Sequence, residues 1–262
     1  MMQKPLILAV ETSGRIGSIA IAFGQQLLAE ATFSSPMRHS AEIFPAAHSL
    51  LERFARKPKE IEHIYISAGP GSFTGLRIAA TMAKTMHLAI AAKIAAVGTL
   101  DVIAANVTTE NTLPNSSHES PASSIQHPAS SIEKIATTLD AKRSQFFIAV
   151  YEYRASSIEH RVSSEGIWKK ILPDSLMTAP QFLDQFARKE KPVWLLGEGL
   201  AYYKDKFKAD GIRFLDECYW TPRAEKVHLL GWQKALAGQF ADPLTLQPTY
   251  LRRPDVKVKR QK

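Results

Sequence analysis

A glycine-rich turn between an apolar strand and a long apolar helix constrains the fold of this chain most. The strand is predicted over 61–68, the turn is Gly69-Pro70-Gly71-Ser72-Phe73-Thr74-Gly75, and the helix is predicted over 76–92. A further strand is predicted over 93–97 and a helix over 100–106, with Thr99 as its cap. Strands that alternate with helices in this way indicate an α/β unit rather than separate layers of each.

Three short apolar runs come before this unit, over 6–10, 18–23 and 27–33. The turns between them are too short for a crossover, so the runs predict an antiparallel meander. A helix is predicted after Ser40, because apolar residues from Ile43 onward recur on one helical face. Pro45 lies inside that pattern, so the helix is expected to start late or to bend there.

Residues 108–134 interrupt the pattern, because they are rich in Ser, Thr, Pro and Asn and lack periodic apolar residues. Such a segment buries too little apolar surface to offset its ordering entropy and is predicted to be a flexible insertion. After it the order of the first half begins again. The sequence therefore predicts two related α/β halves, over 1–107 and 135–251, each a mixed sheet with flanking helices, followed by a basic tail over 252–262.

Composition and charge indicate the cellular compartment of this protein and a possible contact with RNA. The 262 residues include a single cysteine, which excludes a disulfide framework and fits a reducing cytoplasm. No apolar run reaches the ~18 residues of a membrane span, and the run over 6–10 is too short for a signal peptide. The net charge is +8. Much of it lies in the tail, which is either a solvated end or an RNA contact made by Arg252, Arg253, Lys257, Lys259 and Arg260.

Two segments of the first half have features of a phosphate site. Glu11-Thr12-Ser13-Gly14 follows the first strand, and the glycine-rich turn precedes a helix. The candidate residues for binding ATP or ADP are Glu11, Thr12, Ser13, Gly69, Gly71, Ser72 and Thr74. The turn lacks the Lys-Ser/Thr of a Walker A loop, and Pro70 removes one donor. The alternative interpretation is a tight turn in which Ser72 or Thr74 caps the helix.

Metal and hydrolase chemistry are not supported by the sequence. No two of the eight histidines are four residues apart, so the HExxH and HxxxH spacings are absent, and there is no Gly-x-Ser-x-Gly. We predict no metal site and no catalytic residues. In the second half, Asp140 is followed by Ala141-Lys142-Arg143 rather than by glycine, and Gly197-Glu198-Gly199 is explained equally well by strand–turn–helix packing. A nucleotide cleft needs binding features from both halves, and only the first half has them in this sequence.

Several segments together resemble the TsaB (YeaZ) family. They are 6–12, Arg38-His39-Ser40 with Pro45, 69–78, 139–142 and 248–252, of which 69–78 is the most specific. The resemblance implies an actin-like, Hsp70-like (ASKHA) fold and a TsaD-type paralogue that carries the metal and transfers threonylcarbamoyl to adenosine 37 of tRNA. It also implies a TsaE-type ATPase, and tRNA bound through the complex. Two departures are Glu11, where many relatives have Asp, and the long polar segment 108–134.

The resemblance leads us to expect a non-catalytic subunit that scaffolds and activates its partner. An ASKHA-fold transferase or phosphotransferase with its own activity is the alternative, but it would need an acid in the phosphate turn of the second half, or paired histidines. A third possibility is a tRNA-binding adaptor that uses the basic tail. A homodimer is possible when the partner is absent.

The predicted helix over 76–92 carries an apolar arc roughly 200° wide, about twice what a helix facing only its own core requires. One explanation is burial between a sheet and a neighbouring helix of the same chain. Our hypothesis is that an edge of the arc, centred on Ala80 or Met82, meets a partner helix or a second copy. The candidate interface residues are His39, Ile43, Ile78, Ala80, Met82, Ala83 and Met86.

Overall fold

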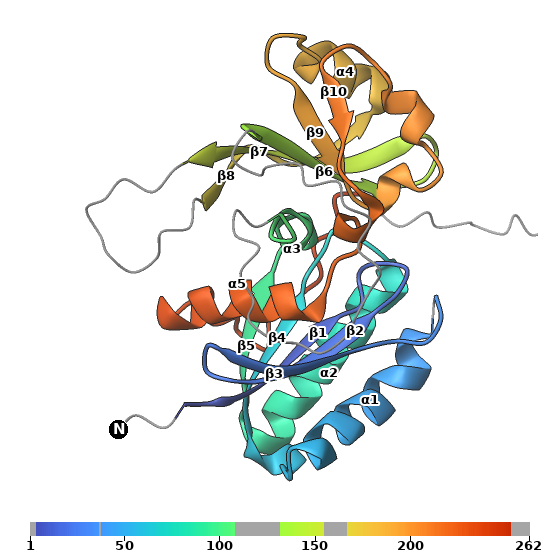
Figure 1. Ribbon diagram of the computed structural model, residues 1–262. Helices are drawn as coiled ribbons and strands as arrows, with labels where there is room; N and C mark the ends of the chain where they lie inside the picture. Colours follow the sequence, from blue (N-terminus) through green and yellow to red (C-terminus); the bar gives the residue numbers. More distant parts are fainter. Residues whose placement is uncertain (1–3, 37, 108–131, 155–166, 253–262) are drawn as a thin grey trace, which may run out of the picture.

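The computed structural model describes residues 4–36, 38–107, 132–154 and 167–252, which form two halves, one above the other (Figure 1). The first half contains a five-stranded sheet with the order β3-β2-β1-β4-β5. Strands β1 (Leu6–Glu11), β2 (Ser18–Phe23) and β3 (Gln26–Thr32) form the expected antiparallel meander. Strands β4 (Ile61–Ser67) and β5 (Lys93–Val97) run parallel to β1.

The second half repeats this topology. Its strands are β6 (Lys134–Asp140), β7 (Gln145–Arg154), β8 (Ile167–Thr178), β9 (Val193–Leu196) and β10 (Ile212–Phe214). Their order is β10-β9-β6-β7-β8, again with an antiparallel meander and two parallel strands beside its first member. This repetition confirms the predicted class, two related α/β halves with mixed sheets. In the strand order β6 corresponds to β1, and Asp140 ends β6 as Glu11 ends β1.

The helices are α1 (His39–Arg53), α2 (Phe73–Ile90), α3 (Thr99–Ala104), α4 (Ala179–Phe186) and α5 (Ala224–Leu236). Short 3-10 helices are η1 (Pro58–Glu60), η3 (Glu198–Leu200), η4 (Lys204–Phe207) and η5 (Glu217–Tyr219). Of the two alternatives expected at Pro45, a late start or a bend, the late start is wrong, because α1 begins at His39 and runs through the proline. The predicted cap at Thr99 is also wrong, since Gly98 takes that position and Thr99 is helical.

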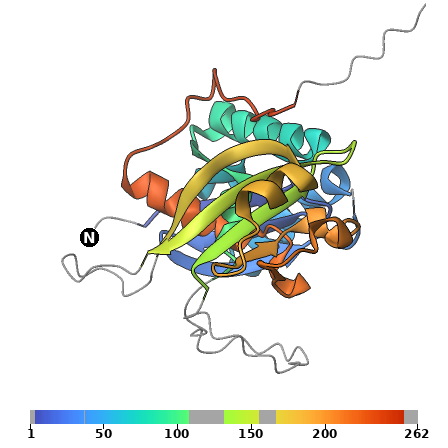
Figure 2. The same cartoon turned by 90° about the horizontal axis from the view of Figure 1, so that it is seen from above.

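Each half supplies one helix that packs on the sheet of the other half. Helices α1 and α2 lie on one face of the first sheet, but the opposite face is covered by α5, which follows the strands of the second half. Gly231 lets α5 approach this sheet, because a Cβ at that position would lie 2.5 Å from the ring of Tyr65. In return, α3 packs on β6 and β7 of the second sheet, so that α3 and α5 lie where the halves meet (Figure 1). Seen from above, the second half lies over the first (Figure 2). Each half therefore needs the other to complete its apolar core.

The structure describes only the last residues of the expected insertion, 132–134. Ile132 is 4% exposed and packs in the core of the second half, and β6 begins at Lys134, so the end of the expected insertion belongs to that half. The rest of the expected insertion, 108–131, and the tail from 253 onward lie outside the described residues.

Candidate functional site: the cleft between the halves

A cleft of about 830 Å³ lies between the two halves. The first half contributes the turn after β1, residues 13–15, and the glycine-rich turn, residues 70–73. The second half contributes 139–142 together with Phe147, Glu198 and Tyr202, and the chain segment 249–252 completes the lining. The volume is that of an ordinary small-molecule site, and the segments come from both halves.

Glu11 lies beneath this cleft rather than in it. Its side chain is fully buried, and Oε1 accepts hydrogen bonds of 2.5 Å from both the N–H and the Oγ–H of Ser13. The Ser67 hydroxyl donates to the other carboxylate oxygen. Burial raises the pKa of Glu11 above its ordinary value, and these hydrogen bonds oppose that rise. The carboxylate therefore stabilises its own turn and does not face a ligand.

The glycine-rich turn is packed directly on the turn after β1. Ser72 N–H donates to Ser13 O at 2.8 Å, and the Thr12 hydroxyl donates to Gly75 O at 2.7 Å. Ser72 Oγ accepts from Gly75 N–H at 3.3 Å, so Ser72 is the cap of α2 that the alternative interpretation named. Several polar groups expected to face a phosphate are thus used within the protein.

Of the seven candidate nucleotide-binding residues, only Ser13, Gly71 and Ser72 line the cleft. Glu11 and Thr12 are buried beside it. Gly69 packs against the backbone of Thr249, and Thr74 is exposed on the first turn of α2. Nucleotide binding by the remaining three stays a prediction.

The second half places two acids in the cleft that we did not name as site residues. Asp140 accepts from the N–H and from Nζ of Lys142, both at 2.7 Å, so its carboxylate is held by its own turn. Glu198 Oε2 accepts from Arg15 N–H of the first half at 2.8 Å. Burial, together with the charge of Glu11, raises the pKa of Glu198 to about 7. The repeated strand order identifies Asp140, but nothing in the sequence pairs Glu198 with Arg15.

The C-terminal segment crosses from one half to the other at the cleft. Thr249 N–H donates to Ala68 O at 2.7 Å, and the ring of Tyr250 lies 4.8 Å from that of Phe73. Arg252 then donates to Ala141 O of the second half at 2.7 Å. Of the five residues predicted to contact RNA, Arg252 is therefore a link between the halves, and the other four lie outside the described residues.

Five of the seven candidate interface residues are buried within the chain. They are His39, Ile43, Ala80, Met82 and Ala83, each 7% exposed or less. The hypothesis that an edge of α2 at Ala80 or Met82 meets a partner is wrong, because α1 and the first sheet of the same chain already cover that side of α2. Ile78 and Met86 are partly exposed and remain candidates.

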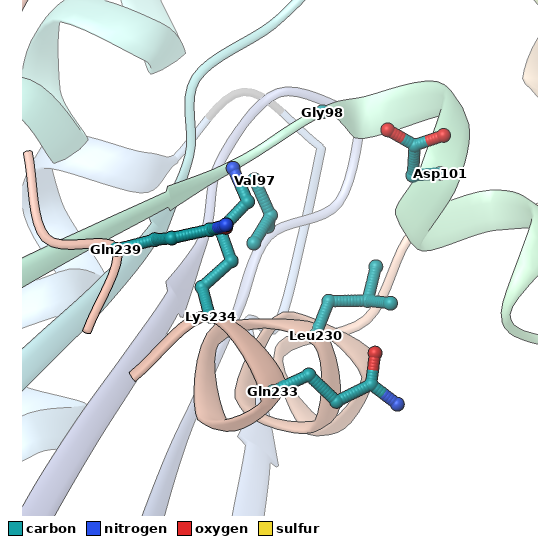
Figure 3. Close-up of a pocket in the computed structure, with 7 residues that line it drawn as sticks. All are labelled: Val97, Gly98, Asp101, Leu230, Gln233, Lys234 and Gln239. Carbon is teal, nitrogen blue, oxygen red and sulfur yellow. The ribbon is translucent and has the colours of Figure 1, made fainter. Parts of the chain in front are cut away.

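A second cavity, of about 280 Å³, lies where α3 and α5 meet (Figure 3). Lys234 of α5 donates to Ala96 O at 2.6 Å, and Asp101 of α3 accepts from the Tyr151 hydroxyl and from Lys170 Nζ, both at 2.8 Å. These contacts join the exchanged helices to the sheets that they cover, so the polar groups here are structural.

The residues that the structure describes contain no group of three or more histidine, cysteine, aspartate or glutamate side chains that could hold a metal ion. None of their helices combines the length and the apolar character that crossing a membrane requires.

The duplicated sheets and the cleft between them define a two-half protein of the ASKHA class. The family model described as "TsaD: tRNA N6-adenosine threonylcarbamoyltransferase" matches residues 26–258, and the chain belongs to this family. Its resemblance within the family is to TsaB (YeaZ). The TsaB protein of Bacillus subtilis, a tRNA threonylcarbamoyladenosine biosynthesis protein, is 28% identical over 257 residues, 97% of this chain and 96% of that relative. The Escherichia coli protein is 22% identical over 94% of each chain.

Solved structures agree with this fold. A Pseudomonas aeruginosa protein described as similar to the peptidase YeaZ superposes with a TM-score of 0.71 at 19% identity, over 95% of this chain and 100% of that one. YeaZ from the same organism gives the same TM-score at 17% identity, over 94% and 100%. At these identities the likeness establishes the architecture, over 94% to 95% of this chain.

Proposed function

We propose that this chain is a non-catalytic subunit of the assembly that installs threonylcarbamoyl on adenosine 37 of tRNA, and that it scaffolds and activates a TsaD-type partner. Similarity to TsaB proteins over nearly the whole chain supports the pathway. The observation that carries the non-catalytic role concerns the acids at the ends of β1 and β6, since the carboxylates of Glu11 and Asp140 both accept hydrogen bonds from their own turns. An enzyme of this fold would need such acids free to face substrate.

The location, the further partners and the nucleotide site that we propose rest on the resemblance to the same family. We propose a cytoplasmic complex that also contains a TsaE-type ATPase and reaches tRNA through its catalytic subunit. ATP or ADP would then bind at an interface with a partner rather than in this cleft. The chain would form homodimers when the TsaD-type partner is absent.

The partner surface is proposed on the outer side of α1 and α2. Ile78 and Met86 are partly exposed there, and Phe44 of α1 and Leu88 of α2 are large apolar side chains exposed to 62% and 82%. Exposed apolar side chains on neighbouring helices are typical of a protein–protein contact.

Replacement of Ile78 or Met86 by glutamate is expected to weaken binding to the TsaD homologue at least about tenfold, because an unpaired charge would be buried only in the complex. The measurements are co-purification stoichiometry, circular dichroism of the isolated chain and restored tRNA modification. Ile171→Glu is the matched control, since Ile171 is an apolar residue 40% exposed on the second half.

Both variants binding as tightly as the control would remove this surface from the proposal. Threonylcarbamoyl transfer or phosphotransfer by the purified chain alone would instead favour the alternative, an enzyme with its own activity.

A further inference from the structure

Three successive backbone N–H groups in the turn after β1 point at carboxylates. That of Ser13 donates to Glu11 Oε1, that of Gly14 helps to lower the pKa of the same carboxyl, and that of Arg15 donates to Glu198 Oε2 at 2.8 Å. Successive backbone N–H groups in a turn can form a nest, a backbone concavity that binds anions. The nest in this protein is filled entirely by its own side chains.

The two carboxylates in the nest differ in origin. Glu11 belongs to the strand that leads into the turn and is fully buried. Glu198 comes from η3 of the other half and lines the cleft. A Cβ on Gly14 would lie only 3.1 Å from Glu198 Oε1, so the carboxylate lies directly against the turn. Glu198 therefore reaches the nest from across the cleft, and its carboxylate lies where an external anion would otherwise bind.

Further contacts hold Glu198 in that place. The Arg15 guanidinium donates to the Tyr202 hydroxyl at 2.5 Å and lies 5.1 Å from the centre of its ring. Tyr202 follows η3 closely, so the backbone and the side chain of Arg15 both bind the same segment of the second half. Charge-assisted hydrogen bonds of this kind are stronger than neutral ones.

We propose that Glu198 fills the anion position of the nest at residues 13–15, so that it keeps phosphate-bearing ligands out of the cleft and joins the two halves. An incoming phosphate would meet a negative charge where it needs a donor, and the Arg15 N–H is already used. Two cations at the cleft are also engaged, since Lys142 Nζ donates to Asp140 and the Arg15 guanidinium donates to the Tyr202 hydroxyl. The role concerns this chain alone and stands whether or not the partner assignment holds.

The experiment uses the full chain without partners, with pyrophosphate and ADP as probes in isothermal titration calorimetry at pH 8. Glu198→Ala removes the occupant, and Glu198→Gln keeps its shape and an acceptor but removes the charge. Glu190→Ala is the control, because Glu190 is an exposed acid away from the cleft. We expect Glu198→Ala to bind pyrophosphate at least about tenfold more tightly than the wild type and the control do.

Hydrogen exchange of the Arg15 amide gives a second readout. Exchange should be about tenfold faster in Glu198→Ala than in the wild type, and unchanged in Glu198→Gln, whose amide oxygen can accept the same bond. If Glu198→Ala does not fold, the Gln variant carries the binding test, because removal of the repelling charge alone should also strengthen pyrophosphate binding. Folded variants that gain no affinity for either probe, or an Arg15 amide that exchanges equally in Glu198→Ala and wild type, would overturn the proposal.

Discussion

Replacement of Gly75 by alanine is expected to unfold the first half of the protein or to lower its melting temperature strongly. A Cβ at this position would lie 1.7 Å from Thr12 O, which no side-chain rotation can relieve because the clashing atom belongs to the backbone. Gly75 and Thr12 are also joined by the hydrogen bond from the Thr12 hydroxyl, so the first turn of α2 and the end of β1 must separate together. We expect a loss of roughly 3 kcal/mol or more.

The control is Gly238→Ala, which tests the conformational cost of replacing a glycine without the clash. Gly238 has a φ of +69°, but a Cβ there would meet nothing within 4 Å. Its loss should be about 1 kcal/mol, the cost of a left-handed alanine. Thermal denaturation of both variants measures the difference, and equal melting temperatures would show that the turns are not packed as described.

The order of elements could be predicted because it depends on local spacing. The turns at Gly14 and Gly24 leave no room for a crossover, which is enough to predict the meander. The long apolar run after Gly75 is enough to predict α2. The recurrence of the same order after residue 134 predicted the second half, and both sheets confirm it.

Which segments pack on each face of the helices and sheets could not be predicted, because this packing depends on contacts between distant parts of the chain. The sequence shows that α2 carries a wide apolar arc, but its periodicity does not say which neighbour covers that arc. Ala80 and Met82 are buried inside the chain because α1 and the sheet lie on that side. The exchange of α3 and α5 between halves is equally hard to predict, since the apolar pattern of a helix does not say which sheet the helix covers.

The candidate site shows the same division between local and distant information. An acid at the end of β1 and a glycine-rich turn are local features, and both lie at the cleft. That Glu11 bonds to Ser13 and Ser67 beneath it depends on β4, which is brought alongside β1 only by the fold. Glu198 is 183 positions from its partner Arg15, and a lone acid between two glycines gives no sign of such a contact.

The stability of the protein should fall as pH rises through neutrality, and Glu198→Gln should remove this part of the dependence. Glu198 has a pKa of about 7 in the folded chain against an ordinary value of 4.5, so the folded state binds more protons between these values. The favourable contribution is therefore complete below pH 4.5 and is lost as pH rises through about 7. Taken over the whole range, the difference is on the order of 3 kcal/mol.

The variant should accordingly match the wild type near pH 4 and exceed it at pH 8. There its melting temperature should be higher by roughly 6–12 °C, because about 1 kcal/mol moves the midpoint by 2–4 °C in a chain of this size. Burial also raises the pKa of Glu11, but that group is present in both proteins and largely cancels in the comparison. Thermal denaturation from pH 4 to 8.5 measures the two curves. Parallel curves would mean that Glu198 is solvated in the folded state, and that the cross-cleft bond to Arg15 does not hold it in a buried position.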